Sequence, residues 1–356
     1  MTIDKIAKII VLFSLFSLAA IFLFREIGID SDIWLHLKTG QYILHNRLIP
    51  SHDIFSYTAY GNNWIDHEWL YQITTYLFYN FFGVNGVIIL RFLIFLCVGL
   101  VLYKLSGPKK NYLLPSVGIF LFLLVIKERL NDRPEMMTLF FLIFFIFVFE
   151  KYFETKLIWL IPFVQLIWAN MHGYFMLGIM IIFAYAVQKT FENRQNLAKL
   201  LKLCVLSVGV SCLNPNGIRG FLYPFNMLIE IRGQSKIFTN YINELLSPFA
   251  VPAHFLIDYL LFYKIIIFLG AVSLALNWKK IKIAHLTIFA VTLLMSVFAI
   301  RNVPLFSLVG AFVFIANFPL EKWKMAKSIQ TSVSLLLILI LVSLFVKEAL
   351  AKYYVF

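Results

Sequence analysis

Residues 86–104 read GVIILRFLIFLCVGLVLYK, and this stretch decides the class of fold. It is almost purely apolar, apart from Arg91 and the lysine at its end. An α-helix needs about 20 mostly apolar residues to cross the hydrocarbon core of a bilayer. The stretch meets this requirement, so we predict that it forms a membrane-spanning helix.

The rest of the chain repeats this pattern. Hydrophobic residues make up 61% of the 356 positions and charged residues only 14%, against roughly 25% charged residues in soluble proteins. The sequence lacks the alternation typical of a membrane β-barrel. We therefore predict an all-α fold, a polytopic transmembrane helical bundle that forms a single integral membrane domain over residues 1–356. About eleven spans are expected, near residues 6–24, 86–104, 113–127, 138–150, 157–171, 173–188, 200–213, 255–276, 284–300, 303–319 and 331–349.

The lysines indicate how the chain is oriented. The net charge is +13, but most of the lysines fall in every second loop between the apolar runs. Such loops are cytoplasmic by the positive-inside rule, so the charge reports topology and nucleic acid is not expected as a partner. We predict a cytoplasmic N-terminus, a retained signal anchor at Ile9–Phe24, and a multi-pass protein of the inner (plasma) membrane. The lysines that support this are Lys5, Lys8, Lys104, Lys109, Lys110, Lys151, Lys156, Lys189, Lys199, Lys202, Lys279, Lys280, Lys282, Lys322, Lys324 and Lys327.

The other side of the predicted bundle carries two long loops. The first, residues 25–85, contains the amphipathic stretches 33–45 and 69–82, both rich in Trp and Tyr. Such aromatic residues are typical of helices that lie in the membrane–water interface. The second long outer loop covers residues 213–252. The shorter outer connections are residues 127–137, 170–173 and 300–303.

Arginine gathers on this outer side, where the positive-inside rule disfavours it. Only Arg194 falls on the cytoplasmic side. The planar guanidinium suits bidentate binding of phosphate or carboxylate, so the group as a whole favours an anionic ligand. The alternative for each arginine is a salt bridge with an outer acid such as Glu26, Asp53 or Glu135. The outer arginines are Arg25, Arg47, Arg91, Arg129, Arg133, Arg219, Arg232 and Arg301.

Acidic residues occupy two positions in the first outer loop. Asp30 and Asp32 follow the first span directly. Two acids there could bind a divalent cation, Mg²⁺ or Mn²⁺, or act as a general base. Asp66, His67 and Glu68 precede the second amphipathic stretch, where a helix N-cap is the alternative role for Asp66.

Ionisable residues recur in the remaining outer connections. Examples are Glu135, His172, Arg219 and Arg301, which come from four separate segments. Such residues near membrane depth are costly, so they are functional candidates by default. We predict that the outer polar segments share one cavity; the alternative is a set of independent interfacial turns.

The first outer loop resembles that of the GT-C glycosyltransferase superfamily, in the branch of the protein O-mannosyltransferases and aminoarabinose–lipid A transferases. Asp30, Trp34 and Pro50 match the acid, aromatic and proline of that loop. Ser31 stands at the usual second acidic position, and Asp32 follows it. Asp32-Ile33-Trp34 is also similar to a motif of oligosaccharyltransferase catalytic subunits, so the equivalent aspartate stays open.

Three further places carry the resemblance, which covers roughly the first 190 residues. They are His67-Glu68-Trp69-Leu70 followed by Phe82-Gly83 and Arg91, then Arg133 with Glu135, and finally His172-Gly173. Two prolines of the family's motif are replaced after His67, and the C-terminal part is similar only in character. The patterns that begin at Trp34 and His67 are also similar to those of a bacterial subgroup of these proteins.

The resemblance implies transfer of a sugar from a polyprenyl-phosphate donor to a glycan, lipid or protein acceptor at the outer face, with inversion. It implies that Asp30, or in second place Asp32, deprotonates the acceptor. Cationic partners of the lipid phosphate would be Arg91, Arg133, Arg219 and Arg301. Glu135, His172, His67 and Glu68 would help to bind the sugar or phosphate, although His172 could simply be a helix-end histidine.

Two other classes of function remain open. A transporter or flippase for an anionic lipid or solute would use the same arginines, but it would need polar residues in the middle of its spans. The span centres are mostly Leu, Ile, Phe and Val, with Lys264 as an exception. A non-catalytic protein of envelope assembly would be expected to lack the catalytic aspartate, and here two candidates are present.

Overall fold

The computed structural model describes residues 3–23, 31–105, 112–129, 132–233, 242–250, 258–319 and 327–353. Within these ranges the fold is all-helical, with fourteen α-helices and no β-strand. This confirms the predicted all-α class.

Eleven of the helices in the described ranges coincide with the predicted spans. They are α1 (Ile3–Leu23), α4 (Val84–Leu105), α5 (Leu113–Ile126), α6 (Glu135–Lys151), α7 (Leu160–Ala169), α8 (Met176–Glu192), α9 (Leu197–Ser211), α12 (Asp258–Leu276), α13 (Ile283–Phe298), α14 (Val303–Asn317) and α15 (Lys327–Tyr353). The other three lie in the two long connections: α2 (Asp32–Asn46), α3 (Trp69–Phe82) and α10 (Gly217–Gly233). Short 3-10 helices complete several connections, including η1 (Lys127–Arg129), η3 (Gly173–Phe175), η5 (Asn243–Leu245) and η8 (Ile300–Asn302).

The apolar helices are those of a membrane-embedded protein. In the part of the chain that the structure describes, five segments are long and apolar enough to cross a membrane, judged by length and composition. They are Lys5–Leu23, Val84–Leu105, Gly173–Glu192, Tyr259–Leu276 and Ile300–Asn317. The other apolar helices are shorter, so the number of eleven spans stays a prediction.

Helix α14 forms the centre of the bundle, where it packs against α5, α12 and α13. Small residues make this close approach possible. A Cβ added at Gly310 of α14 would lie 2.4 Å from the side chain of Ile266, and one at Gly118 of α5 would lie 2.7 Å from Ile315. Membrane helices associate through such small residues because lipid supplies no hydrophobic drive between them.

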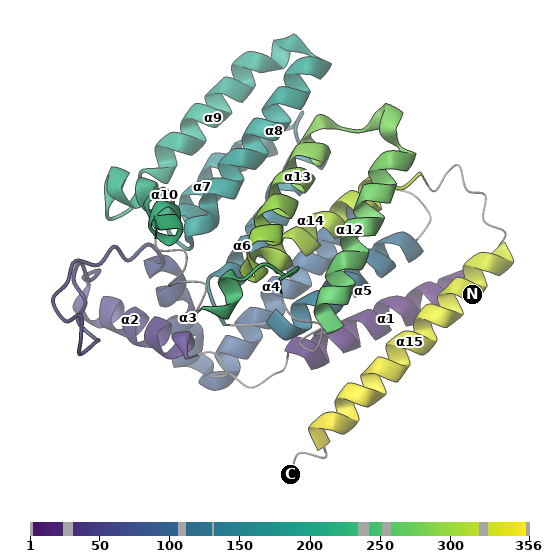
Figure 1. Cartoon of the computed structure of the whole chain (residues 1–356), viewed down its shortest axis with the longest axis horizontal. Coiled ribbons are helices and arrows are strands. Elements are labelled where there is room, and N and C mark those ends of the chain that lie inside the picture. The colour runs from purple at the N-terminus through teal and green to yellow at the C-terminus, as the bar shows by residue number, and fades with distance from the viewer. Residues whose placement is uncertain are drawn as a thin grey trace.

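Helices α2 and α3 pack against each other beside the start of α4, at one end of the bundle (Figure 1). Gly40 of α2 lies against the backbone of Gln72, and Gly86 of α4 lies against the backbone of Phe78. A larger side chain at either glycine would overlap those backbone atoms. Helices α2 and α3 are therefore held in a fixed position, and we call these two helices the platform.

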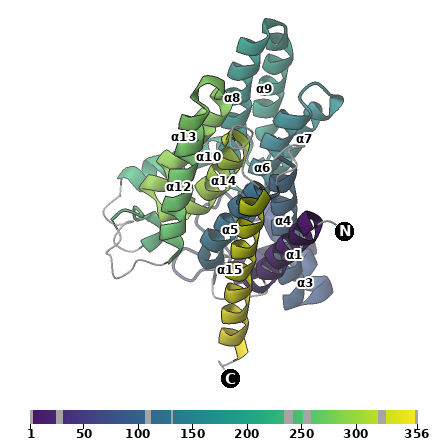
Figure 2. The same cartoon turned by 90° about the vertical axis from the view of Figure 1, so that its right-hand side faces the viewer.

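The helices α1 and α15 lie side by side on one flank of the bundle (Figure 2). Leu15 and Leu18 of α1, and Leu337 and Leu341 of α15, are buried in the core. This flank supplies mainly apolar packing, with one polar contact of 3.0 Å between Tyr112 Oη and Ser334 Oγ of α15.

Candidate functional site

Several outer connections meet at the end of the bundle that carries α2, α3 and α10 (Figure 1). Two backbone hydrogen bonds hold distant segments there. Leu70 N, in the first turn of α3, donates to Asn170 O at 3.2 Å. Ile300 N donates to Leu246 O at 2.9 Å, which fixes the segment after η5 against η8. The platform, the α7–α8 turn and η5 are thus brought to one surface.

The arginine cluster consists of Arg129, Arg133 and Arg301, from η1, the turn before α6, and η8. Arg129 Nη2 lies 3.2 Å from Glu244 Oε2, and Arg133 Nη1 lies 3.2 Å from Glu244 Oε1. Burial raises the pKa of Glu244, but the charges of Arg301, Arg133 and Arg129 outweigh it and hold the pKa below its usual range. The two oxygens of one carboxylate are thus held by two separate guanidiniums.

Asp32 joins this cluster from the first turn of α2. Its Oδ2 atom lies 2.9 Å from Arg133 Nη2, and its side chain is 49% exposed. The structure therefore brings a predicted catalytic acid, Asp32, into direct contact with a predicted phosphate-binding residue, Arg133. Asp30 lies outside the described residues.

Glu135 and Arg301 lie deeper in the same cluster. Glu135 Oε1 and Arg301 Nε are buried without a hydrogen-bond partner among the described residues. The guanidinium carbon of Arg301 lies 5.7 Å from the centre of the Tyr174 ring, and Tyr174 Oη donates to Asn302 Oδ1 at 2.6 Å. The cluster thus keeps polar atoms unsatisfied where a ligand with hydrogen-bonding oxygens could reach them.

The histidine–carboxylate cluster consists of Asp66, His67, Glu68 and His172. Glu68 Oε1 lies 3.4 Å from His67 Nε2 and 3.8 Å from His172 Nε2. Burial opposes the charge on Glu68, but the hydrogen bond and charge of His67 lower its pKa to about 2. In the same way burial disfavours charge on His67, yet Glu68 raises the His67 pKa above its usual value. Each of these two residues therefore favours the charged form of the other.

His172 is neutral in this surrounding, because burial lowers its pKa to about 3. Trp168 Nε1 donates to Thr138 Oγ1 at 3.2 Å, and Thr138 Oγ1 lies 2.7 Å from His172 Nδ1. Since the hydroxyl oxygen accepts from Trp168, its own proton is available for Nδ1. This arrangement favours the tautomer with hydrogen on Nε2, which faces Glu68. His172 also contacts the ring of Tyr174 at 4.8 Å, so it connects the two clusters.

Asp66 is the most buried acid of the histidine–carboxylate cluster, at 2% exposure. Its Oδ1 atom accepts from Glu68 N at 3.3 Å and from Gln72 Nε2 at 3.0 Å, so it stabilises the start of α3 as an N-capping residue would. Oδ2 is buried and has no hydrogen-bond partner within the described ranges. Burial raises the pKa of Asp66 to about 6.

Two adjoining cavities lie beside Asp66. One is a polar pocket of about 10 Å³ whose walls include Asp66, His67 and Asn170. The other is an apolar groove of about 450 Å³ whose walls include Leu166 and Ile167 of α7. The side chains of Trp69, Asn170, Asn214 and Pro215 line both cavities.

The remaining predicted arginines lie elsewhere. Arg91 is only 1% exposed, and its Nη1 atom lies 3.1 Å from Asp132 Oδ1. In this position the guanidinium pairs with a buried acid in the interior and does not face the arginine cluster. Arg219 is exposed near the start of α10. For Arg91, Arg129 and Arg133 the salt-bridge alternative is therefore observed, with Asp132, Glu244 and Asp32 as the acids.

The sequence also predicts a candidate divalent-cation site at Asp30 and Asp32. No group of three or more His, Cys, Asp or Glu side chains in the described ranges is placed to hold a metal ion. The Asp32 carboxylate instead faces a guanidinium, which disfavours a cation at the same oxygen. Metal binding at Asp30 and Asp32 stays a prediction.

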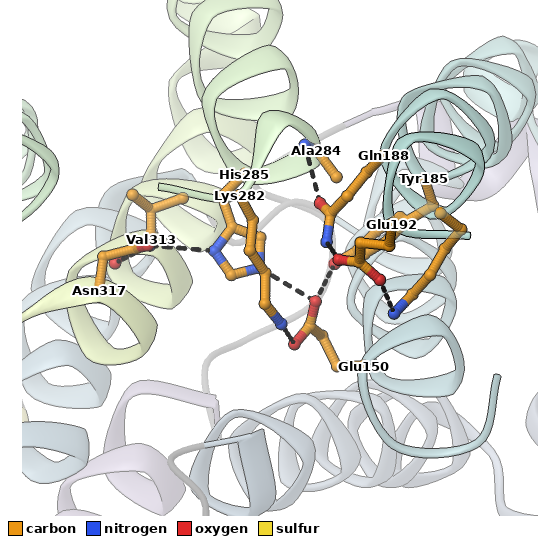
Figure 3. Close-up of polar contacts among 10 residues, drawn as sticks. Glu150, Tyr185, Gln188, Glu192, Lys282, Ala284, His285, Val313 and Asn317 are labelled. Atoms are coloured by element: carbon orange, nitrogen blue, oxygen red, sulfur yellow. Dashed lines mark hydrogen bonds and ion pairs between the residues drawn. The ribbon is translucent and has the colours of Figure 1, made fainter. Parts of the chain in front are cut away.

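A second polar network lies at the opposite end of the same helices (Figure 3). Glu150 of α6 accepts hydrogen bonds from Tyr185 Oη at 3.0 Å and from Lys282 Nζ, and its Oε1 lies 3.1 Å from His285 Nε2. His285 Nδ1 in turn lies 3.1 Å from the side-chain nitrogen of Asn317. We call Glu150, Tyr185, Lys282, His285 and Asn317 the inner network. It joins α6, α8, α13 and α14.

Sequence reasoning did not single out several residues of the site. Glu244 lies in a long connection without a motif, and Thr138, Trp168 and Tyr174 are read as ordinary members of apolar runs. Arg129 is part of the outer arginine group, but nothing in its spacing distinguishes it from Arg219. The sign of each charge could be read from the sequence, but which residues are neighbours in space could not.

No protein-family model matches this chain, and comparison with curated proteins also gives no match.

Proposed function

We propose that this chain is a membrane glycosyltransferase of the GT-C type, which transfers a sugar from a polyprenyl-phosphate donor to an acceptor hydroxyl at the outer face of the inner membrane. One observation carries the proposal. Arg129, Arg133 and Arg301 come from three separate connections and converge beside Asp32 and Glu244. A cluster of cations next to an acid, at the end of apolar helices, suits chemistry on a lipid phosphate.

The arginine cluster supports binding of the phosphate. The Glu244 carboxylate contacts two guanidiniums: Arg129 lies 3.2 Å from Oε2, and Arg133 lies 3.2 Å from Oε1 and 3.3 Å from Oε2. A phosphate group offers the same acceptor geometry with more oxygens and more charge, so it can replace this carboxylate. Arg301 Nε supplies a further buried donor without a partner among the described residues.

The chemistry follows from the placement of acid and cations. The acceptor hydroxyl oxygen attacks the anomeric carbon, and the bond from that carbon to the phosphate oxygen breaks. The electron pair stays on the polyprenyl phosphate, whose added charge the arginines stabilise. The hydroxyl proton passes to the acid that follows the first span, Asp30 or Asp32. Attack from the side opposite the phosphate inverts the anomeric configuration.

We propose further that all eleven apolar helices span the membrane, with the N-terminus in the cytoplasm. The lysine-bearing connections then lie inside, as the positive-inside rule requires, and the arginine cluster lies outside. The donor's hydrocarbon chain would enter from the outer leaflet, and its phosphate would lie at the depth of the arginine cluster.

A transporter or flippase is the runner-up. It would need a polar path from the arginine cluster to the inner network. The centre of α14 between them carries buried Phe306, Val309 and Phe312. These residues close the bundle with apolar packing, which favours an enzyme over a transporter. A non-catalytic envelope protein is distinguished by the experiment below.

The test replaces both Asp30 and Asp32 with Asn. The purified full chain in nanodiscs is incubated with undecaprenyl phosphate-linked glucose, mannose or aminoarabinose, and released undecaprenyl phosphate is measured by mass spectrometry. The wild type is expected to release it, and the double variant to lose about 10²–10⁴-fold in rate, as removal of a general base does.

Glu154→Gln is the matched control, because this acid is 78% exposed and follows the inner end of α6. It should leave release unchanged. Release at the wild-type rate in a folded double variant would refute the base assignment, and no release from any of the three donors by the wild type would contradict the proposed activity with them.

A further inference from the structure

Asp66 lines the small pocket, and its Oδ2 atom is buried without a hydrogen-bond partner among the described residues. The neighbouring amides are already engaged. Asn170 Oδ1 accepts from Trp69 Nε1 at 2.8 Å, and Asn170 Nδ2 donates to Leu213 O at 3.1 Å. Asn214 Nδ2 donates to two backbone oxygens, and Asn214 Oδ1 accepts from a backbone nitrogen. A ligand that enters the pocket therefore contacts a carboxylate oxygen, which can accept a hydrogen bond from one donor.

The size of the pocket limits that donor. A volume of about 10 Å³ is close to what one water molecule or one hydroxyl group needs. A phosphate or a sugar ring is too large for it. The Asp66 carboxyl in the pocket wall also disfavours an anionic group. The pocket is thus shaped for a single neutral hydroxyl.

The apolar groove begins where this pocket ends. The two cavities share Trp69 and Asn170, and beyond them the groove is lined by Leu70, Leu166 and Ile167. One turn away on α7, Phe163 is 60% exposed, so this side of the helix faces apolar surroundings. A hydrocarbon chain would bury its surface here, whereas a peptide or glycan would leave its polar groups without partners.

We infer that the pocket and groove together bind a membrane lipid that carries a free hydroxyl, with the hydroxyl on Asp66 and the hydrocarbon chain along α7. Resting on the proposed function, this lipid is the acceptor. Asp66 anchors one hydroxyl of the headgroup, and a second hydroxyl of the same headgroup is the nucleophile, whose proton passes to the acid after the first span. Contacts from Glu68 through His172 and Tyr174 to Arg301 make the histidine–carboxylate cluster and the arginine cluster neighbours.

The experiment uses a monoacylglycerol with a photoactivatable diazirine in its chain, added to the full chain in nanodiscs of dioleoylphosphatidylcholine. Mass spectrometry should find the label on peptides that contain Leu166–Ile167 or Leu213–Pro215. Monoolein and farnesol are separate competitors, which distinguish an acyl from an isoprenoid alcohol. Methyl oleate has no hydroxyl and should compete at least tenfold less well than the better of the two.

Two variants separate the pocket from the groove. Ile167→Trp fills the groove and should lower labelling at least tenfold, while Leu201→Trp, on an exposed face toward the other end of α9, should leave it unchanged. Asp66→Asn keeps the shape but removes the charge, and should weaken competition by the hydroxyl lipid about tenfold without changing gel-filtration behaviour.

Label spread evenly over other helices, or equal competition by methyl oleate, would overturn the inference. Sugar transfer is not needed for this assay. Lipid binding without release of undecaprenyl phosphate from any donor would therefore sink the proposed function and leave the lipid site standing. Donor turnover without specific labelling would do the reverse.

Discussion

The two ends of helix α6 carry the same kind of residue in opposite situations. At one end, Glu150 accepts from Tyr185 and Lys282 and contacts His285. At the other, Glu135 keeps a buried oxygen without a hydrogen-bond partner among the described residues. No buried atom of the inner network, within the residues described, shares that condition.

The difference teaches how to separate a structural polar network from a binding site in this protein. A network that satisfies its own donors and acceptors holds helices together and leaves nothing for a ligand. The outer clusters keep orphaned atoms on Asp66, Arg129, Glu135 and Arg301, in the part of the chain described. Each orphan reduces stability, so its retention favours a functional role.

The largest expected effect breaks the inner network. Glu150→Gln leaves Lys282, His285 and Tyr185 without their anionic acceptor, and removal of one partner of a buried pair costs about 3 kcal/mol. Glu135→Gln at the other end of α6 should cost less than half of that. Thermal unfolding of both variants in detergent measures the difference. Equal losses would mean that the two ends do not differ in their role.

The next effect concerns Asp66 and pH. Its pKa is raised from 3.8 to about 6 in the folded protein. The folded state therefore holds this proton more tightly than the unfolded state, and stability falls as the pH rises from about 4 to about 6. At 1.36 kcal/mol per pKa unit the loss is at most about 3 kcal/mol.

Asp66→Asn should remove this loss, so the variant should gain stability relative to the wild type between pH 4.5 and pH 7. Glu68 titrates near pH 2, below this window. His67 is present in both proteins, so its contribution to the pH dependence is reduced when the stability of one protein is subtracted from that of the other. If the melting temperatures of the two proteins change with pH in parallel across this range, folding does not raise the pKa of Asp66.

A third prediction sharpens the assignment of the arginine cluster. Arg133→Ala and Arg301→Ala should each weaken binding of undecaprenyl phosphate about 10- to 100-fold, the expected loss of a hydrogen bond to a charged group. Arg194→Ala is the control, because Arg194 is exposed and lies in the connection between the inner ends of α8 and α9. Binding is measured by native mass spectrometry in nanodiscs. An equal loss with Arg194→Ala would indicate only a general charge effect.

The smallest effect tests Glu244 as an internal competitor. Glu244→Gln removes the charge that Arg129 and Arg133 now balance. A phosphate then no longer has to displace a charged carboxylate from the arginines. The affinity for undecaprenyl phosphate should therefore rise about fivefold, or about 1 kcal/mol in binding free energy. Weaker binding in this variant would show that Glu244 helps to assemble the arginine cluster instead of competing for it.

Much of the fold follows from hydropathy alone. Apolar runs locate a helix at each of the eleven predicted ranges, and aromatic amphipathic patterns anticipate α2 and α3. The helix α10 was missed, because Gly217, Gly220 and Pro224 are typical of a loop. The structure nevertheless places Pro224 inside this helix.

The site is harder to predict than the fold, because contacts between distant segments decide it. The sign of the charges placed Asp32, Arg133, Glu135 and Arg301 on one side, and the structure brings them to one cluster. The same reasoning could not tell that Arg91 has Asp132 as a buried partner. Sequence spacing predicts a side of the membrane for each residue, but not which acid will face which arginine.

The short length of α6 has a consequence for the distance between the two ends of the bundle. Its two carboxylates, at Glu135 and Glu150, are about 22 Å apart along the helix axis, at 1.5 Å per residue. Helix α6 is buried among α4, α7, α8 and α14, so its length is set by packing within the protein. A hydrocarbon core is about 30 Å thick, so the two polar clusters at the ends of α6 lie closer together than the two faces of such a core.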